Sequence, residues 1–210
     1  MRYNISMISC ILLTAGNSSR FGSPKALALL NNTTNVITRL QNTLLATQVH
    51  EVIVVLGAHS EKIKPSIIRH KKIKSTVNQE HQLGQTSSFK TGLQMVSNRS
   101  LGVMLLPVDC PFIQAQTIDR LIREFIQTNP HILIPTYHKK NGHPPIFNVS
   151  LVPALLQMDN SMGLNSYQKQ SNINTFYFEI DDEWILKSFN TSIDFERLKK
   201  EYSLEHAAEI

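Results

Sequence analysis

The chain has 210 residues, of which 41% are hydrophobic and 18% are charged, and its formal net charge is +5. This length fits one α/β domain with a buried core, and the composition is ordinary for a soluble globular protein and argues against a disordered chain. No apolar run is long enough to span a bilayer, and we interpret residues 1–9 as structure rather than as a signal peptide. The two separate cysteines, Cys10 and Cys110, indicate neither a disulfide framework nor a zinc site. We therefore expect a cytoplasmic protein.

The basic surplus lies in short pairs such as Lys71–Lys72, Lys139–Lys140 and Lys199–Lys200. Short pairs of this kind are usually solvated surface, and no nucleic-acid-binding signature accompanies them. We therefore expect neither nucleic acid nor a membrane as partner, and small anionic ligands remain open.

Apolar runs that end at turn residues alternate with segments of helical spacing as far as residue 134. In chain order we predict a strand Ile8–Leu13, a helix Val36–Thr47, a strand Glu51–Leu56, a helix Glu61–His70, a strand Lys74–Val77, a helix Ser87–Val96, a strand Leu101–Leu106 stopped by Pro107, a helix Gln116–Thr128 and a strand His131–Ile134 ended by Pro135. Strands that alternate with such helices predict βαβ units and a mainly parallel sheet.

After Tyr137 the pattern is less regular. Residues 141–145 predict a turn, and a strand starts on the return at Ile146. We predict a further strand at Thr175–Ile180 and a terminal helix at Ile193–Tyr202. No repeat or linker divides the chain, so we expect one domain over residues 1–210. The expected fold class is α/β: a Rossmann-like, three-layer α/β/α domain with a mixed, mainly parallel sheet.

The first candidate site follows the first predicted strand, where doubly wound sheets bind their ligands. Its sequence is Leu13-Thr14-Ala15-Gly16-Asn17-Ser18-Ser19-Arg20-Phe21-Gly22-Ser23-Pro24-Lys25. Glycines let the backbone approach a ligand, backbone N–H groups and hydroxyls can cradle phosphate oxygens, and the two cations can bind phosphate. The segment is neither a Walker A loop nor a dinucleotide fingerprint, and a Gly/Ser-rich surface turn is the simpler alternative. With Arg20 and Lys25 at this strand end, we favour a phosphate site.

Two weaker motifs lie further along the chain. Asp109 directly follows a buried strand, where a carboxylate suits Mg²⁺ held together with substrate phosphates, although a helix cap or turn explains it equally well. His143 stands between Gly142 and two prolines, which fix its direction and suit a ligand contact. Taken alone, this third motif is better explained as a stiff hairpin turn.

The first two motifs together resemble the MobA/MocA-like nucleotidyltransferases of the GT-A glycosyltransferase-type fold, and the similarity runs in order from about Ile8 to Tyr202. Residues 13–16 and the Gly142-His143-Pro144 motif resemble the molybdenum cofactor cytidylyltransferase branch in particular. Residues 77–88 are similar to that branch's Asn…Gly-x-x-x-Ser segment.

The resemblance implies an Mg²⁺-dependent enzyme that transfers CMP from CTP to the molybdenum (molybdopterin) cofactor and releases pyrophosphate. Its partners would be CTP or another NTP, the molybdopterin-type cofactor and a molybdenum hydroxylase. The implied catalytic residues are Arg20 and Lys25 on the triphosphate and Asp109 on Mg²⁺. Those implied for nucleotide binding are Leu13, Thr14, Ala15, Gly16, Asn78, Gly84 and Ser88. His143 would face the acceptor.

The chain also departs from this family. Asn190 occupies the second metal-contact position, where its amide oxygen can bind Mg²⁺ but brings no charge. Residues 159–165 lack the arginine that the family tends to carry, and His81 stands where an aromatic residue is common. Two alternatives therefore stay open. One is guanylyl transfer or transfer to a sugar phosphate, and the other is a non-catalytic molybdenum cofactor carrier for a hydroxylase.

Overall fold

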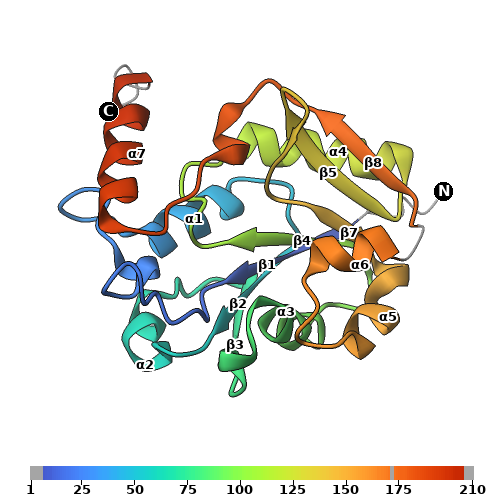
Figure 1. Cartoon of the computed structure of the whole chain (residues 1–210), viewed down its shortest axis with the longest axis horizontal. Coiled ribbons are helices and arrows are strands. Elements are labelled where there is room, and N and C mark those ends of the chain that lie inside the picture. The colour runs from blue at the N-terminus through green and yellow to red at the C-terminus, as the bar shows by residue number, and fades with distance from the viewer. Residues whose placement is uncertain (1–6, 171–172, 206–210) are drawn as a thin grey trace.

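The structure is a computed structural model, and it describes residues 7–170 and 173–205. Its middle layer is an eight-stranded sheet with the order β3-β2-β1-β4-β7-β5-β6, and β8 pairs with β5 (Figure 1). The strands are β1 (Met7–Leu13), β2 (Glu51–Leu56), β3 (Ile73–Val77), β4 (Ser100–Pro107), β5 (Ile132–Tyr137), β6 (Lys140–Asn141), β7 (Ile146–Asn148) and β8 (Thr175–Glu179). Strands β3, β2, β1 and β4 run parallel to one another, as β5 does to β8, whereas β7 is antiparallel to both neighbours and β6 to β5. The predicted mixed, mainly parallel sheet is confirmed.

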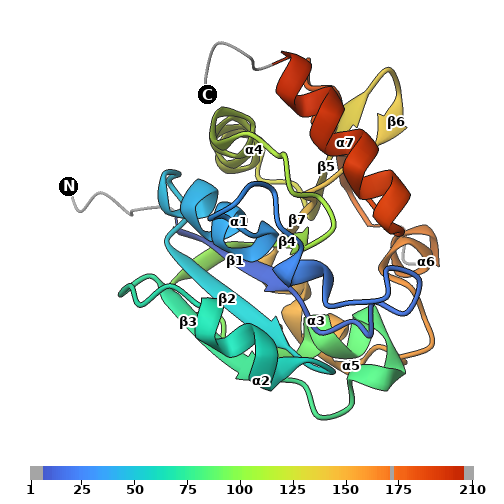
Figure 2. The same cartoon turned by 90° about the vertical axis from the view of Figure 1, so that its left-hand side faces the viewer.

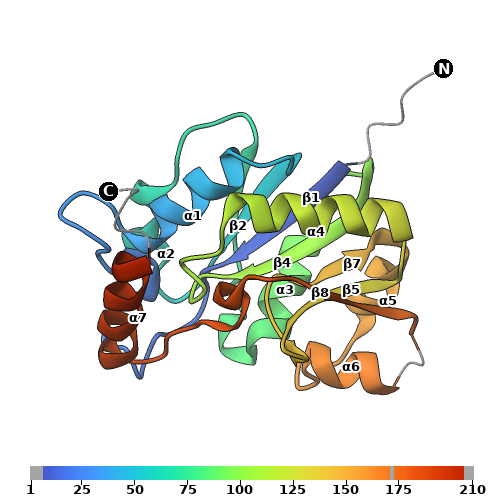
Figure 3. The same ribbon diagram turned by 90° about the horizontal axis from the view of Figure 1, so that it is seen from above.

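Helices cover both faces of the sheet. They are α1 (Val36–Leu45), α2 (Ser60–Ile63), α3 (Gln85–Leu93), α4 (Ala115–Thr128), α5 (Val152–Gln157), α6 (Leu164–Gln170) and α7 (Ser192–Glu205). Helices α1 and α4 lie on one face, and α3, α5 and α6 lie on the other (Figure 3). This arrangement confirms the three-layer α/β/α fold. No helix within the described ranges combines the length and the apolar character needed to cross a membrane.

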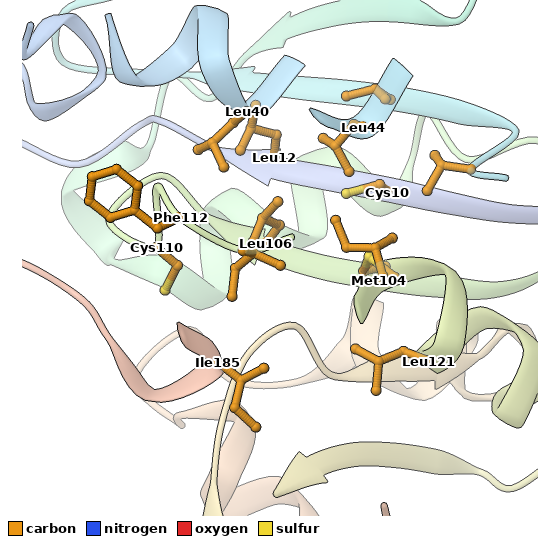
Figure 4. Packing of buried hydrophobic residues seen from close by; sticks show 14 of the residues in the cluster. Cys10, Leu12, Leu40, Leu44, Met104, Leu106, Cys110, Phe112, Leu121 and Ile185 are labelled. Carbon is orange, nitrogen blue, oxygen red and sulfur yellow. The ribbon is translucent and has the colours of Figure 1, made fainter. Parts of the chain in front are cut away.

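The core consists of two apolar clusters, one on each face of the sheet. Successive side chains of a strand point to opposite faces, so Cys10 and Leu12 of β1 enter one cluster and Ile11 and Leu13 enter the other. The first cluster includes Leu40 and Leu44 of α1, Met104 and Leu106 of β4 and Leu121 of α4 (Figure 4). Because β1, β2 and β4 are buried on both faces, their sequences are nearly continuous apolar runs.

A buried carboxylate joins the amino-terminal ends of the central strands. Glu51, at the start of β2, is 4% exposed. Its carboxylate accepts hydrogen bonds from the Ser9 hydroxyl and the Ser97 backbone N–H, each at 2.7 Å, and pairs with Lys74 Nζ at 2.7 Å. The Ser9 hydroxyl also contacts the Ser100 hydroxyl. One side chain thus links β1, β2, β3 and the segment that enters β4.

Two predicted boundaries are wrong because of prolines. The predicted helix over residues 61–70 ends after α2 and a 3₁₀ turn at Lys64–Ser66, since Pro65 has no N–H to donate to the carbonyl four residues earlier. Pro135 does not end its strand. Along one side of β5, β7 pairs with residues 132–133 and β6 pairs with residues 136–137. Pro135 lies between these two pairings, so its missing N–H removes no hydrogen bond from the sheet. The interpretation of residues 1–9 as structure holds for the start of β1, and residues 1–6 lie outside the described residues.

Candidate functional site

A cleft of about 350 Å³ opens at the carboxyl ends of β1 and β4. Its walls are the loop after β1, the residues that follow β4, the segment leading into α3, and one residue just before α7. The lining includes ten of the sequence-predicted site residues: Leu13, Thr14, Ala15, Gly16, Arg20, Lys25, Gly84, Ser88, Asp109 and Asn190. Figure 2 shows the loop after β1 on the same side of the molecule as the start of α7.

The loop after β1 is held by its own backbone and by its neighbours. The N–H and hydroxyl of Thr14 both donate to the Val55 carbonyl, at 2.9 and 2.8 Å. Gly57 lies so close that a Cβ there would be 2.5 Å from the Ala15 carbonyl oxygen. Ser18 has a φ of 53°, and its carbonyl accepts hydrogen bonds from the next residues of the loop while its hydroxyl accepts one from the Lys25 N–H at 3.2 Å. The loop therefore presents a fixed polar wall to the cleft.

Lys25 stands at the centre of the charged part of the cleft. Its ammonium donates to the Phe189 carbonyl at 2.6 Å, to Asn190 Oδ1 at 3.0 Å and to Asp109 Oδ2 at 3.3 Å. Arg20 Nη2 donates to the same Asn190 oxygen at 2.9 Å. The Lys25 side chain is 12% exposed and that of Asp109 is 29% exposed, so the pair is only partly screened by water.

The start of α7 holds Asn190 in this position. The Asp194 carboxylate accepts hydrogen bonds from the backbone N–H groups of Asn190 and Thr191, at 3.2 and 3.0 Å, and the Thr191 hydroxyl accepts one from the Asp194 N–H. These bonds hold the pKa of Asp194 below its ordinary value, and the bonds with Thr191 have the largest effect. The reciprocal pattern is a helix cap, and it fixes the backbone just before α7.

Aromatic rings join the loop after β1 to α7. The Phe21 ring packs edge-on against the Phe189 and Phe195 rings, with centroid distances of 5.3 and 5.8 Å. The Phe189 N–H donates to the Asp109 carbonyl at 3.1 Å. Three segments that are far apart in the sequence therefore meet at the charged end of the cleft.

Asn78 supports the cleft without lining it. Its side chain is buried, and its amide donates to the hydroxyls of Ser87 and Ser88, at 3.0 and 3.1 Å. Its oxygen accepts a hydrogen bond from the Glu80 N–H at 3.0 Å. Of these residues, Ser88 lines the cleft. Asn78 thus contacts a lining residue from behind the cleft wall, and its predicted place near the nucleotide stays a prediction.

His143 also lies outside the cleft lining. Its backbone N–H donates to the Ile185 carbonyl at 2.8 Å, and Gly142 packs so closely on Ile185 that a Cβ would lie 2.7 Å from that side chain. Burial lowers the pKa of His143, and the negative charge of Asp109 opposes that shift. The imidazole is therefore uncharged at neutral pH, in the neighbourhood of Asp109.

Some lining residues were not singled out from the sequence. Gln82 and Gln85 lie on either side of Gly84 and line the cleft. Their closeness to that predicted site residue in the sequence could have identified them as lining residues. The Phe189 carbonyl gave no signal, because a main-chain oxygen is present at every residue.

The donor set suits a hard cation. Asp109, Asn190 and the Phe189 main chain provide three oxygens that converge on one positive charge, the Lys25 ammonium. Carboxylate, amide and carbonyl oxygens are the ligands that divalent cations such as Mg²⁺ and Mn²⁺ accept in proteins. The residues present therefore fit a divalent cation.

The sequence matches one family model, described as a MobA-like NTP transferase domain, over residues 10–174. A probable UDP-N-acetylglucosamine pyrophosphorylase of Acanthamoeba polyphaga mimivirus is 29% identical over 135 residues, which are 62% of this chain and 52% of that protein. A probable molybdenum cofactor guanylyltransferase of Thermococcus sibiricus is 25% identical over 133 residues, 63% of each chain. The chain thus spans about half of the first relative's length and less than two thirds of the second's.

Solved structures share the fold at low sequence identity. A homologue of Rv0371c from Mycobacterium sp. strain JC1 has a TM-score of 0.81 and 22% identity, covering 92% of this chain and 96% of that one. Rv0371c of Mycobacterium tuberculosis in complex with manganese has a TM-score of 0.76 and 19% identity, with 93% and 99% covered. A nucleotidyl transferase of Methanothermobacter has a TM-score of 0.77 and 18% identity, with 93% and 97% covered.

Proposed function

Because this chain belongs to the MobA-like NTP transferase family, we propose that it transfers a nucleoside monophosphate from an NTP to a phosphate on a small molecule and releases pyrophosphate. Membership of the family predicted from the motifs is confirmed. The observation that carries the proposal is the convergence of Arg20, Lys25 and Asp109 in one cleft beside the glycine-containing loop. The proposal treats residues 1–210 as one nucleotidyltransferase domain.

The acceptor phosphate is already an anion at neutral pH, so the reaction needs no general base. One acceptor oxygen attacks the α-phosphorus of the NTP, and the bond from that phosphorus to the bridging oxygen breaks. The electron pair leaves with pyrophosphate. Positioning and charge stabilisation carry most of such a transfer.

The chain's own residues have separate tasks in this proposal. Arg20 and Lys25 bind the triphosphate and stabilise the departing pyrophosphate, and the loop N–H groups hold phosphate oxygens. Asp109 and Asn190 would hold Mg²⁺, which when bound neutralises phosphate charge. Ser88 and Gly84, with Asn78 behind them, form the wall on the nucleotide side.

Within this class we propose CTP and the molybdenum (molybdopterin) cofactor as the substrate pair. The Gly142-His143-Pro144 motif, which resembles the cytidylyltransferase branch, supports this choice. The reaction would take place in the cytoplasm, where the two buried free cysteines stay reduced, and a molybdenum hydroxylase would receive the product.

Two other readings have specific support. The relatives at 29% and 25% identity favour sugar-phosphate uridylyl transfer and guanylyl transfer, respectively. Asn190, which is uncharged at the second metal position, favours a cofactor carrier without catalysis.

The test is pyrophosphate release from CTP, GTP, ATP and UTP with Mg²⁺, measured with molybdenum cofactor, with N-acetylglucosamine 1-phosphate and with no acceptor. Release that needs both CTP and the cofactor supports the proposal. Release with another pair reassigns the substrates within the class. Absence of release with every pair, together with tight cofactor binding, supports the carrier and contradicts the transferase proposal.

A further inference from the structure

We infer that the Lys25 ammonium fills the cation site of the nucleotide-free protein, so that a divalent cation and a triphosphate bind tightly only together. The inference rests on the proposed function, because it assigns Asp109, Asn190 and the Phe189 carbonyl to the metal and Lys25 to the phosphates. In the nucleotide-free protein the Lys25 ammonium donates hydrogen bonds to these three oxygens, and the bonds persist until the metal and the triphosphate bind.

Every donor of the Lys25 ammonium already has a partner. An ammonium has three N–H groups, and Lys25 Nζ has three oxygen partners, at 2.6, 3.0 and 3.3 Å. No donor is left for a phosphate oxygen. Lys25 therefore must release at least one of these partners before it can bind a triphosphate.

The oxygens of Asn190 and Asp109 that Lys25 contacts are occupied as well. An amide oxygen has two lone pairs, and Asn190 Oδ1 accepts hydrogen bonds from both Lys25 and Arg20. Asp109 Oδ2 faces Lys25. A divalent cation that approached these oxygens would have to displace two cationic donors, and it would meet their repulsion at contact distance.

The Lys25 side chain is also largely buried. The Lys25 side chain is 12% exposed, and its Nζ lies 5.2 Å from the centre of the Phe189 ring. In such a partly dry site the ammonium needs new anionic partners when it leaves the three oxygens. Phosphate oxygens of an NTP provide them, whereas a metal ion alone does not. The metal and the nucleotide are therefore thermodynamically coupled, and the coupling is reciprocal.

The experiment measures Mn²⁺ binding to the nucleotide-free protein by the electron paramagnetic resonance signal of free Mn²⁺. Lys25→Met keeps the aliphatic stem and removes the charge and the donors. We expect it to bind one Mn²⁺ on the order of tenfold more tightly than the unmodified protein. Lys62→Met is the matched control: it removes an equal charge from an exposed lysine of α2, and it should leave the Mn²⁺ affinity within about twofold.

A double variant identifies the site. Adding Asp109→Ala to Lys25→Met should remove the gained affinity. The inference is overturned if folded Lys25→Met binds Mn²⁺ no more tightly than the unmodified protein, or if the gain survives the loss of Asp109. Should Lys25→Met not fold by circular dichroism, Lys25→Gln takes its place, since it also removes the positive charge from the site.

The coupling itself is measured with α,β-methylene-CTP, which cannot release pyrophosphate. In the unmodified protein, saturating analogue should strengthen Mn²⁺ binding by about 10- to 100-fold beyond the binding of Mn²⁺ to the free analogue. In Lys25→Met this factor should be smaller, and an equal factor contradicts the inference. The nucleotide-free measurement uses no NTP, so a failure of the proposed function appears in the pyrophosphate assay and a failure of this inference appears in Mn²⁺ binding.

Discussion

Asp109 is the one carboxylate among the described residues that line the cleft. Asp109→Ala should therefore remove metal-dependent pyrophosphate release, with a loss of at least about 10²- to 10³-fold in kcat, because no other lining residue can supply the charge. The measurement is kcat with and without Mg²⁺, with circular dichroism to verify the fold. Full Mg²⁺-dependent turnover in a folded variant would show that Asp109 is not the metal ligand.

A substitution at Gly16 would test how closely a ligand approaches the loop after β1. A Cβ at Gly16 would have no heavy atom within 4 Å in the nucleotide-free structure. Gly16→Ala should leave the melting temperature nearly unchanged and weaken nucleotide binding by about tenfold, because in the proposed function phosphate oxygens approach the backbone of this loop and the new methyl group would stand in their way.

Gly163→Ala is the control for that substitution, since a Cβ at Gly163 also has nothing within 4 Å and Gly163 does not line the cleft. Isothermal titration calorimetry with the NTP gives both affinities. Equal affinities in the two variants would place the phosphates away from Gly16.

At the scale of elements, Glu51 is the clearest point of attachment between strands. Burial raises the pKa of Glu51, but the bonds from Lys74, Ser9 and Ser97 outweigh burial and hold this pKa below its ordinary value. A carboxyl group with a lowered folded-state pKa stabilises the fold above its unfolded pKa, and that stabilisation is lost as the pH falls through the folded pKa.

Glu51→Gln should accordingly lower the free energy of unfolding by about 1 to 3 kcal/mol at pH 7, because Lys74 and the Ser97 N–H lose a charged acceptor. The difference between the two proteins should shrink as the pH falls below about 4.5, the ordinary range of a glutamate pKa. Urea unfolding at a series of pH values measures it. A difference that does not change with pH would mean that packing, and not the carboxylate charge, holds this end of the sheet.

The elements that the sequence predicted well are those whose burial leaves a periodic pattern. Strands β1, β2 and β4 are apolar on both faces, and α4 has an apolar stripe from Ile118 to Phe125. Helices α5 and α6 were not predicted, because six and seven residues are too few for a clear helical period. Helix α5 packs on α3 and contains a proline in its first turn. In the sequence alone, that proline suggests a break in a helix.

At the scale of the whole molecule, the sequence predicted some parts of the candidate site and not others. Residues 13–25 and Asp109 could be found because each segment follows a buried strand, and parallel strands end at one edge of the sheet. That Lys25 meets Phe189, 164 positions later, could not be derived from spacing. That contact depends on how α7 packs against Phe21, which is tertiary structure with no local signal.

This meeting of distant segments predicts a pattern of hydrogen exchange. The family match ends at residue 174, yet residues 189 and 190 complete the charged end of the cleft. An NTP analogue with Mn²⁺ should slow amide exchange in residues 14–25 and in residues 187–194 over the same concentration range, because one ligand orders both segments. Helix α4, which does not line the cleft, serves as the internal reference. Protection of the first segment alone would show that the segment before α7 does not take part in binding.

The oxygen of Phe189 has a consequence for how this site can vary. A main-chain carbonyl is supplied by whichever residue occupies the position, so a substitution at Phe189 alters the aromatic packing and retains the oxygen. Inserting one residue between Thr191 and Asp194 would separate Phe189 from the helix cap, shift that oxygen away from Lys25 and retain every side chain named in the site. Among related chains we therefore expect the residue type at the position of Phe189 to vary, while the number of residues between this position and the helix cap stays constant. An alignment that compares residue types alone will overlook this oxygen, whereas one that compares the lengths of segments will reveal it.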